Sequence, residues 1–304
     1  MATESRTLVI LALIANAVIA VVKFIAAGIS GSSAMLAEGF HSVADTGNQL
    51  FLLRGAAVSR YGADAKHPFG RGKELYFWSF MVAVFLFVGG AVVAFVEGLE
   101  RVRHPVEDAG GLVFSLVVLA FAAAFEGFVA LRPALKQFNE IRTGRSIRAT
   151  VRDGRDPALL VVVFEDTAAM VGIAVAASGL LLAHFTGWSQ WDGIASIVLA
   201  FLLAGVAWIL AFEMKALLVG EAATRGQRSL IRAVTLSVPQ VKSIGRLLTM
   251  QLSPREILVN MDVDLVDGLS DVEVEAAIDV IEEAIKDVVP AATRIFIELE
   301  SDAS

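Results

Sequence analysis

Hydrophobic residues are concentrated in six long stretches over the first two thirds of the chain. A helix that crosses a bilayer needs roughly 20 mostly apolar residues, because the hydrocarbon core is about 30 Å thick. Each of the six stretches is long enough, although the second is amphipathic. The pattern therefore predicts six transmembrane helices, at Thr7–Ile29, Ser33–Val58, Leu75–Leu99, Gly111–Leu131, Pro157–Phe185 and Trp191–Leu218.

After Leu218 the long apolar runs give way to short segments typical of a soluble domain. Period-2 alternation indicates strands, and Ser270 followed by Glu273 is a capping box that opens a helix. The predicted elements are, in order, a helix at Gly226–Ser237, strands at Val241–Leu252 and Glu256–Val266, a helix from Ser270 to Val288 and a strand at Arg294–Leu299. The order αββαβ indicates a small α+β domain of ferredoxin-like type. We expect an α-helical membrane domain over residues 1–218 and this domain over residues 219–304.

Composition supports a membrane protein and excludes several other classes. The 304 residues are 56% hydrophobic and only 19% charged, whereas a soluble domain carries about 25% charged residues. The chain has no cysteine, which excludes disulfides and thiolate metal ligands. A net charge of −7 argues against a nucleic-acid partner. The first apolar stretch is too long for a cleavable signal, so none is expected.

Basic residues are distributed unevenly among the predicted loops. The loops after the first and fifth stretches contain no Lys or Arg, and the positive-inside rule places Lys- and Arg-rich loops in the cytoplasm or an organelle matrix. We therefore expect both termini in the cytoplasm, and a cell inner or plasma membrane as the location. Arg101 and Arg103, in the loop after the third stretch, lower the contrast. The basic loops carry Arg60, Lys66, Arg71 and Lys73, and Arg132, Lys136, Arg142, Arg145, Arg148, Arg152 and Arg155.

Ionisable residues inside the second stretch indicate a metal site. His41 and Asp45 are spaced i, i+4 and so share one face of a helix. An imidazole nitrogen with a carboxylate suits a borderline cation such as Zn²⁺. Glu38 lies close to the same face. Hydrogen bonding to neighbouring helices is the alternative role for all three residues.

The fifth stretch contains a second candidate pair, Glu165 and Asp166. Adjacent residues point about 100° apart around a helix, so both can hardly ligate one small cation. We expect Asp166 to be the ligand. Three roles stay open for Glu165: it supports a ligand, it carries a proton, or it forms a structural ion pair.

The loop before the third stretch reads Asp64-Ala65-Lys66-His67-Pro68-Phe69-Gly70-Arg71-Gly72-Lys73. Its glycines and proline require a tight turn. Asp64 and His67 are candidates for a second metal site near the membrane surface. The alternative is that these residues fold the loop and contact lipid phosphate.

These motifs together resemble the cation diffusion facilitator family. They are the H-S-V-A-D run at His41–Asp45, the H-P-F-G-R-G-K loop from His67 and the D-G-I-A-S run from Asp192. The resemblance covers nearly the whole chain. It implies six spans, a ferredoxin-like cytoplasmic domain, a homodimer, and a tetrahedral transport site shared by the second and fifth spans.

The chain departs from the usual family pattern at three places. Val162 stands where many members have a second histidine, four residues before Asp166, and the F-E-D-T-A-A run resembles the branch with a mitochondrial zinc transporter. Arg71 replaces a histidine of the loop site. The C-terminal domain has no histidine, so the family's histidine-bearing cytoplasmic metal site is absent as such.

We expect export of a divalent metal cation by proton antiport and alternating access, with Zn²⁺ first and Mn²⁺ or Fe²⁺ as alternatives. Metal and protons are then substrates, and no prosthetic group is required. A transporter of a non-metal cation and a membrane metal sensor stay open. An enzyme is not expected, because no H-E-x-x-H motif or nucleophile constellation is present.

Overall fold

The computed structural model describes residues 2–105, 111–142, 146, 150 and 157–300. They divide into two compact units, each described here by itself. Unit 1 comprises Met1–Ala57 and Phe77–Met214, and unit 2 comprises Val58–Tyr76 and Lys215–Ser304. Unit 2 therefore includes the Asp64–Lys73 loop as well as the C-terminal part of the chain.

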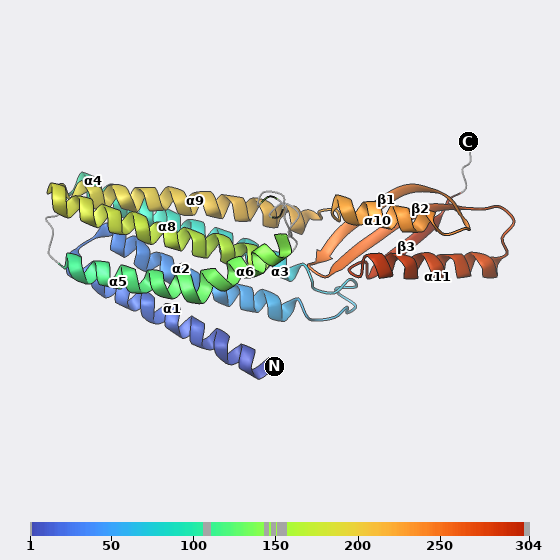
Figure 1. Ribbon diagram of the computed structural model, residues 1–304, viewed down its shortest axis with the longest axis horizontal. Coiled ribbons are helices and arrows are strands. Elements are labelled where there is room, and N and C mark those ends of the chain that lie inside the picture. The colour runs from blue at the N-terminus through green and yellow to red at the C-terminus, as the bar shows by residue number, and fades with distance from the viewer. Residues whose placement is uncertain (1, 106–110, 143–145, 147–149, 151–156, 301–304) are drawn as a thin grey trace. The chain divides into compact units, whose positions relative to one another are not determined.

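Unit 1 is made of long helices that run side by side (Figure 1). The first, second, fifth and sixth apolar stretches form α1 (Ala2–Ser30), α2 (Ser33–Val58), α8 (Pro157–Thr186) and α9 (Gln190–Val219). The turns between α1 and α2 and between α8 and α9 contain Gly31 and Gly187, with φ of 65° and 71°. Because these φ values are left-handed, the two turns favour glycine.

The third and fourth stretches form longer helices than predicted, and each contains a π-helical segment. The first consists of α3 (Glu74–Phe85), η1 (Leu86–Val92) and α4 (Val93–Arg103). The second consists of α5 (Leu112–Phe125), η2 (Glu126–Leu131) and α6 (Arg132–Arg142). Such segments widen one turn of a helix and occur often at functional sites.

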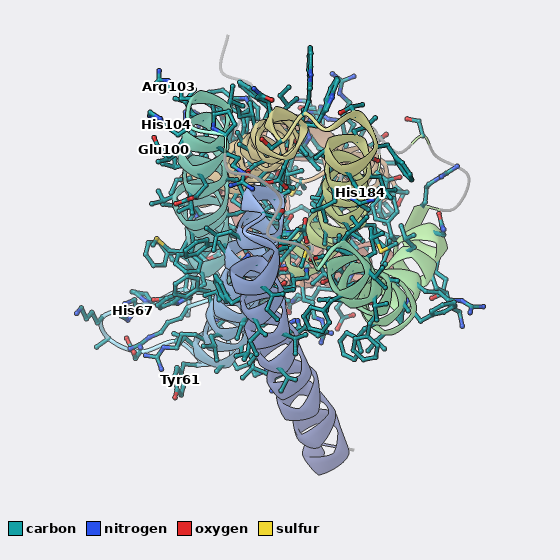
Figure 2. All side chains as sticks on the ribbon, turned by 90° about the vertical axis from the view of Figure 1, so that its left-hand side faces the viewer. Tyr61, His67, Glu100, Arg103, His104 and His184 are labelled. Carbon is teal, nitrogen blue, oxygen red and sulfur yellow. The ribbon has the colours of Figure 1, made fainter. Side chains whose placement is uncertain are left out.

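The prediction that Arg101 and Arg103 lie in a loop was wrong. Both belong to the last turn of α4, and Figure 2 shows Glu100, Arg103 and His104 together at this end. The helix of the fourth apolar stretch also continues past Leu131 into α6, since polar residues can prolong a helix beyond its apolar part. It includes Arg132, Lys136 and Arg142. Arg145, Arg148, Arg152 and Arg155 lie outside the described residues.

Within the described residues, four helices are long and apolar enough to cross a membrane: Glu74–Arg103, Leu112–Glu140, Pro157–Thr186 and Gln190–Val219. In α1, the described side chains form a shorter apolar segment, Asn16–Ser30, and most of the side chains before it lie outside the described part of the structure. α2 is less apolar, since it carries Glu38, Asp45 and Arg54. Unit 1 is thus a helical domain of membrane type, and a crossing by α1 and α2 stays a prediction.

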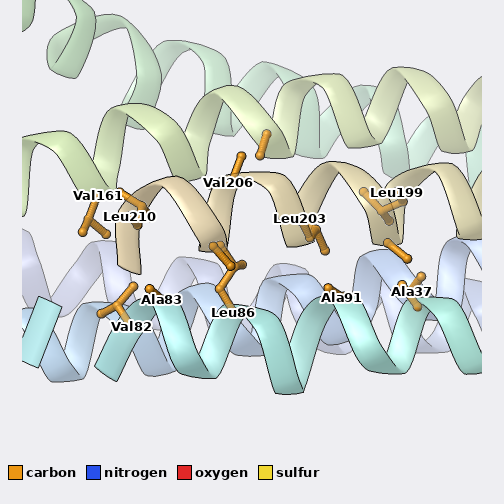
Figure 3. Packing of buried hydrophobic residues seen from close by; sticks show 14 residues of the cluster. Ala37, Val82, Ala83, Leu86, Ala91, Val161, Leu199, Leu203, Val206 and Leu210 are labelled. Atoms are coloured by element: carbon orange, nitrogen blue, oxygen red, sulfur yellow. The ribbon is translucent and has the colours of Figure 1, made fainter. Parts of the chain in front are cut away.

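A cluster of buried aliphatic residues holds α9 against the helix formed by α3, η1 and α4 (Figure 3). Leu86 of η1 and Leu203 of α9 are fully buried in it. The same two helices approach most closely at Gly98 and Gly193. A Cβ added at either glycine would lie 2.8 Å from the backbone oxygen of the other. Small residues at such crossings let membrane helices pack backbone to backbone.

Unit 2 has the predicted αββαβ order of elements: α10 (Arg225–Leu236), β1 (Val241–Ser253), β2 (Glu256–Leu265), α11 (Asp271–Val288) and β3 (Arg294–Leu299). The sheet order is β1-β2-β3, with β1 antiparallel and β3 parallel to β2. The predicted capping box is present, since the Ser270 N–H donates to Glu273 Oε2 at 2.8 Å. A second capping box, Thr224 with Gln227 at the start of α10, was not predicted.

The core of unit 2 lies between its helices and the central strand. Ile231 of α10, Ile281 of α11 and Ile257 of β2 are fully buried. The Asp64–Lys73 loop packs on the end of β1, because a Cβ at Gly72 would lie 2.7 Å from the Leu252 carbonyl oxygen. Unit 2 is therefore a small α+β domain with one three-stranded sheet.

The substitution Gly98→Ala is expected to destabilise unit 1 by about 1–3 kcal/mol, since the new methyl group meets the backbone of α9. Gly205→Ala on α9 is the matched control, because no described atom lies within 4 Å of a Cβ there. It is expected to be neutral or stabilising by about 0.5–1 kcal/mol. Thermal unfolding of the purified protein in detergent measures both, and equal stability of the two variants would contradict the close approach.

Candidate metal site

One face of α2 carries a row of buried polar residues. Glu38, His41 and Asn48 are fully buried, Ser42 is nearly so, and Asp45 is 8% exposed. Their spacing of three or four residues places them along one side of the helix. Polar groups at such positions require partners inside the protein or a bound ligand.

His41 and Asp45 form the first part of the site. Nδ1 of His41 lies 3.3 Å from Oδ1 of Asp45, as the i, i+4 spacing predicts. Neither of these two atoms, nor Nε2 of His41, has a hydrogen-bond partner within the described residues. The pair therefore offers both ring nitrogens and a carboxylate oxygen to a further group.

The second part comes from α8, where Glu165 and Asp166 differ in environment. Glu165 is 5% exposed and accepts a hydrogen bond from Nδ2 of Asn48 at 3.2 Å. Its carboxyl group also lies within hydrogen-bonding reach of Asp45. Two carboxyl groups at this distance require a proton or a cation between them. Asp166 is half-buried, and its Oδ2 is buried without a partner in the described part of the chain.

The structure thus brings the two predicted pairs to facing positions on α2 and α8. The contacts link His41 to Asp45, and Asp45 to Glu165. Among the described residues, no three His, Asp or Glu side chains converge closely enough to coordinate one ion. An ion shared by both helices would therefore require them to shift or their side chains to rotate.

A buried cluster beside this site was not predicted. Lys23 of α1 is fully buried, and its ammonium group donates to Glu38 Oε2 at 3.0 Å, Ser42 Oγ at 2.9 Å and Glu126 Oε1 at 3.3 Å. Glu126 is the first residue of η2. The signal in the sequence was the occurrence of Lys23 and Glu126 inside apolar stretches, where an uncompensated charge costs several kcal/mol.

Asp192, at the start of α9, holds the N-terminus of α2. Its carboxylate accepts hydrogen bonds from the Ser32 hydroxyl, from the Ser33 N–H at 2.6 Å and from the Ala34 N–H at 3.3 Å. Arg101 Nε lies 3.5 Å from the same carboxylate. Negative charge at a helix N-terminus is favourable, so Asp192 fixes the helix that carries His41.

The contacts of the Asp64–His67 pair are those of a folded loop. Asp64 Oδ1 accepts from the backbone N–H groups of Lys66 and His67, and Oδ2 accepts from Arg71 at 2.9 Å. Nδ1 of His67 lies 3.1 Å from Oδ1 of Asp64. The pKa of Asp64 is lowered to about 2. The hydrogen bond from the His67 N–H makes the largest contribution, and the hydrogen bond from Arg71 makes the next largest. These contacts favour the alternative in which the residues fold the loop.

Other histidine and aspartate residues lie elsewhere in the chain. His104 and His184 are exposed near helix ends (Figure 2). Asp262 of β2 accepts a hydrogen bond from Arg246 Nε at 2.7 Å, which lowers the pKa of Asp262. Oδ2 of Asp264 lies 3.0 Å from Lys242 Nζ. Both aspartates of β2 are therefore paired with basic residues.

Comparisons with known proteins identify the family of the chain. Residues 9–219 match the cation efflux transmembrane domain, and residues 225–302 match the cytoplasmic domain of cation efflux proteins. The chain belongs to the cation efflux family. The resemblance to cation diffusion facilitators is thereby confirmed.

Three curated relatives indicate what proteins of this kind do. Metal tolerance protein C4 of Arabidopsis thaliana is 34% identical over 72% of this chain and 48% of its own length. The mitochondrial proton-coupled zinc antiporter SLC30A9 of Homo sapiens is 29% identical over 80% of this chain and 43% of its own length. The manganese efflux system protein MneP of Bacillus subtilis (strain 168) is 24% identical over 80% of this chain and 78% of its own length. The chain thus spans about half the length of the plant and human relatives.

The substitution Asp64→Asn is expected to loosen residues 58–76 at neutral pH, because the carboxylate accepts the hydrogen bonds that fold the loop. Hydrogen–deuterium exchange of this peptide measures the effect. In the wild type the pKa of Asp64 is lowered on folding, so its contribution is present above about pH 4 and is lost as the pH falls towards 2. Asp267→Asn, at another exposed carboxylate, is the control and leaves the exchange of this peptide unchanged.

A loop that folds in this way needs no ion, so Zn²⁺ is expected to leave its exchange unchanged. Strong protection of the wild-type peptide by Zn²⁺, lost in Asp64→Asn, would instead support a second metal site.

Proposed function

We propose that the chain exports a divalent metal cation across a membrane in exchange for protons. The observation that carries this proposal is the set of buried ionisable groups on facing helices, His41 and Asp45 on α2 and Glu165 and Asp166 on α8. Unpartnered nitrogen and oxygen atoms inside an apolar bundle are unfavourable unless a ligand or a proton binds there. A site that alternates between a metal ion and protons meets this requirement.

In this proposal His41, Asp45 and Asp166 are the ligands. Each offers a buried atom without a hydrogen-bond partner in the described residues. Glu165 already accepts a hydrogen bond from Asn48 and contacts Asp45, so it fits a role beside the ligands. Protons arriving from the far side of the membrane compete for the same carboxylates and imidazole, since these groups bind a metal only when deprotonated.

The topology proposed is six spans with both termini in the cytoplasm and a homodimeric assembly. The match to the cytoplasmic domain of the family supports the location of the C-terminal part. The αββαβ order supports a ferredoxin-like fold for residues 219–304, with residues 1–218 as the membrane domain. A bacterial inner membrane or plasma membrane is the proposed location, and the human relative is mitochondrial by its name.

Zinc is the first candidate for the substrate, and Mn²⁺ and Fe²⁺ are the alternatives. A single histidine with two carboxylates binds Zn²⁺ well, but oxygen-rich sites also accept harder ions. The relatives include a protein named as a zinc antiporter and one named as a manganese efflux protein. The donor set and these names together support a divalent cation as the substrate.

Transport of Zn²⁺ into liposomes with an acidic interior tests the proposal. The wild type is expected to take up Zn²⁺ with counterflow of protons, because an inward metal flux requires an outward proton flux. His41→Ala, Asp45→Asn and Asp166→Asn are expected to reduce uptake to the level of empty liposomes. Glu165→Gln is expected to lower the apparent metal affinity about 10–100-fold, the effect typical of a group that supports a ligand.

The control for these variants is Glu282→Gln, at an exposed carboxylate of α11 that pairs with Lys286. It is expected to transport like the wild type. The proposal fails if correctly inserted wild-type protein moves none of Zn²⁺, Mn²⁺, Fe²⁺, Co²⁺ and Cd²⁺. Full activity of Asp166→Asn combined with inactive Glu165→Gln would exchange the roles of these two residues.

A further inference from the structure

The ammonium group of Lys23 occupies a cage of oxygen atoms that is built like a cation site. Its three acceptors come from Glu38 and Ser42 on α2 and from Glu126 on η2, at 2.9–3.3 Å. Lys23 and Glu38 are fully buried, and Glu126 is 8% exposed. Two carboxylates and a hydroxyl around one positive group are the ligand types that hard divalent cations prefer.

Each carboxylate of the cage has an oxygen to spare. Oε1 of Glu38 and Oε2 of Glu126 are buried without a partner in the described residues. Oε1 of Glu38 points towards α8, since a Cβ added at Gly172 would lie 2.7 Å from it. The cage therefore contains two carboxyl groups for the single basic group of Lys23. The cage thus has both the charge and the free oxygen atoms to hold a doubly charged ion.

The cage also adjoins the proposed transport site along α2. Ser42 follows His41 in the chain, and Glu38 precedes His41 by three residues. Asp45 is close enough to Lys23 to interact with it electrostatically. The Lys23 side chain reaches this face of α2 from α1, through its contacts with Glu38 and Ser42.

We propose that Lys23 is a tethered cation that fills this second site and so keeps Glu38 and Glu126 from binding a metal. The lysine restricts the divalent ion to the proposed ligands His41, Asp45 and Asp166, and so determines which metal is bound. Without it, two further carboxylates become available, and the balance of donors moves from nitrogen to oxygen. The role in specificity rests on the proposed function, whereas occupation of the cage does not.

The test is the binding of Mn²⁺ and Zn²⁺ to the purified full-length protein in detergent, measured by equilibrium dialysis. Lys23→Met removes the charge and keeps much of the side-chain volume. It is expected to bind an additional Mn²⁺ ion per chain compared with the wild type. Lys23→Met/Glu38→Gln/Glu126→Gln has the same apolar replacement without the carboxylates, and it is expected to lose this additional ion.

The folded state of each variant is checked by thermal unfolding with and without Mn²⁺. A Lys23→Met protein that folds only with a divalent cation supports the proposal, because the ion then replaces the ammonium group. A Lys23→Met protein that is folded but binds no additional ion overturns it. So does a protein that stays unfolded at every metal concentration, since Lys23 would then act only as a structural ion pair.

These outcomes are separate from the transport test. The wild type could transport no metal while Lys23→Met gains an ion that depends on Glu38 and Glu126. This result would support the proposal for the cage and contradict the proposed transport function. If the wild type transports Zn²⁺ and Lys23→Met gains no ion, the transport function is supported and the proposal for the cage is overturned. In liposomes, the Lys23→Met protein is expected to move Mn²⁺ relative to Zn²⁺ more readily than the wild type. An unchanged ratio would remove the role of Lys23 in specificity.

Discussion

Ionisable groups between apolar helices must be paired, protonated or bound to an ion, because burial of an isolated charge costs several kcal/mol. Unit 1 meets this constraint in two ways. Around Lys23 the charges are paired within the protein, and the ammonium group joins three elements through Glu38, Ser42 and Glu126. Around His41 and Asp45 the pairing is incomplete, and buried atoms have no partner in the described residues. The first group links the helices to one another, and in our proposal the second group binds the substrate.

The packing of the helices follows from the same constraint. α8 has a glycine where it passes Glu38, since a Cβ at Gly172 would meet the carboxylate. The N-terminus of α2 is held by Asp192, which accepts hydrogen bonds from consecutive backbone N–H groups. π-helical geometry begins at Glu126, the residue that completes the cage around Lys23. The helix that carries His41 and Asp45 is therefore fixed by polar contacts at its end and along its middle.

Features that depend on neighbouring residues in the chain could be predicted from the sequence. The limits of α2 and β3 are as predicted, and the capping box at Ser270 is present, because periodicity and capping are local properties. The extension of the fourth helix to Arg142 was missed, since hydropathy reports the end of an apolar run and not the end of a helix. Lys23 and Glu126 each stand out inside an apolar stretch, but no local pattern shows that these two residues, 103 positions apart, contact each other.

The choice between Glu165 and Asp166 shows the same limit within the site. Helix geometry separates the two side chains by about 100°, but it does not say which one faces α2. In the structure Glu165 meets Asn48 and Asp45, whereas Asp166 keeps a buried oxygen free. A carboxylate that is already hydrogen-bonded orients its neighbours, and one that is free can take an ion. A transporter needs both kinds, because an ion held by every nearby carboxylate would not be released. In our proposal, the fixed charge of Lys23 limits how many of them can hold the ion.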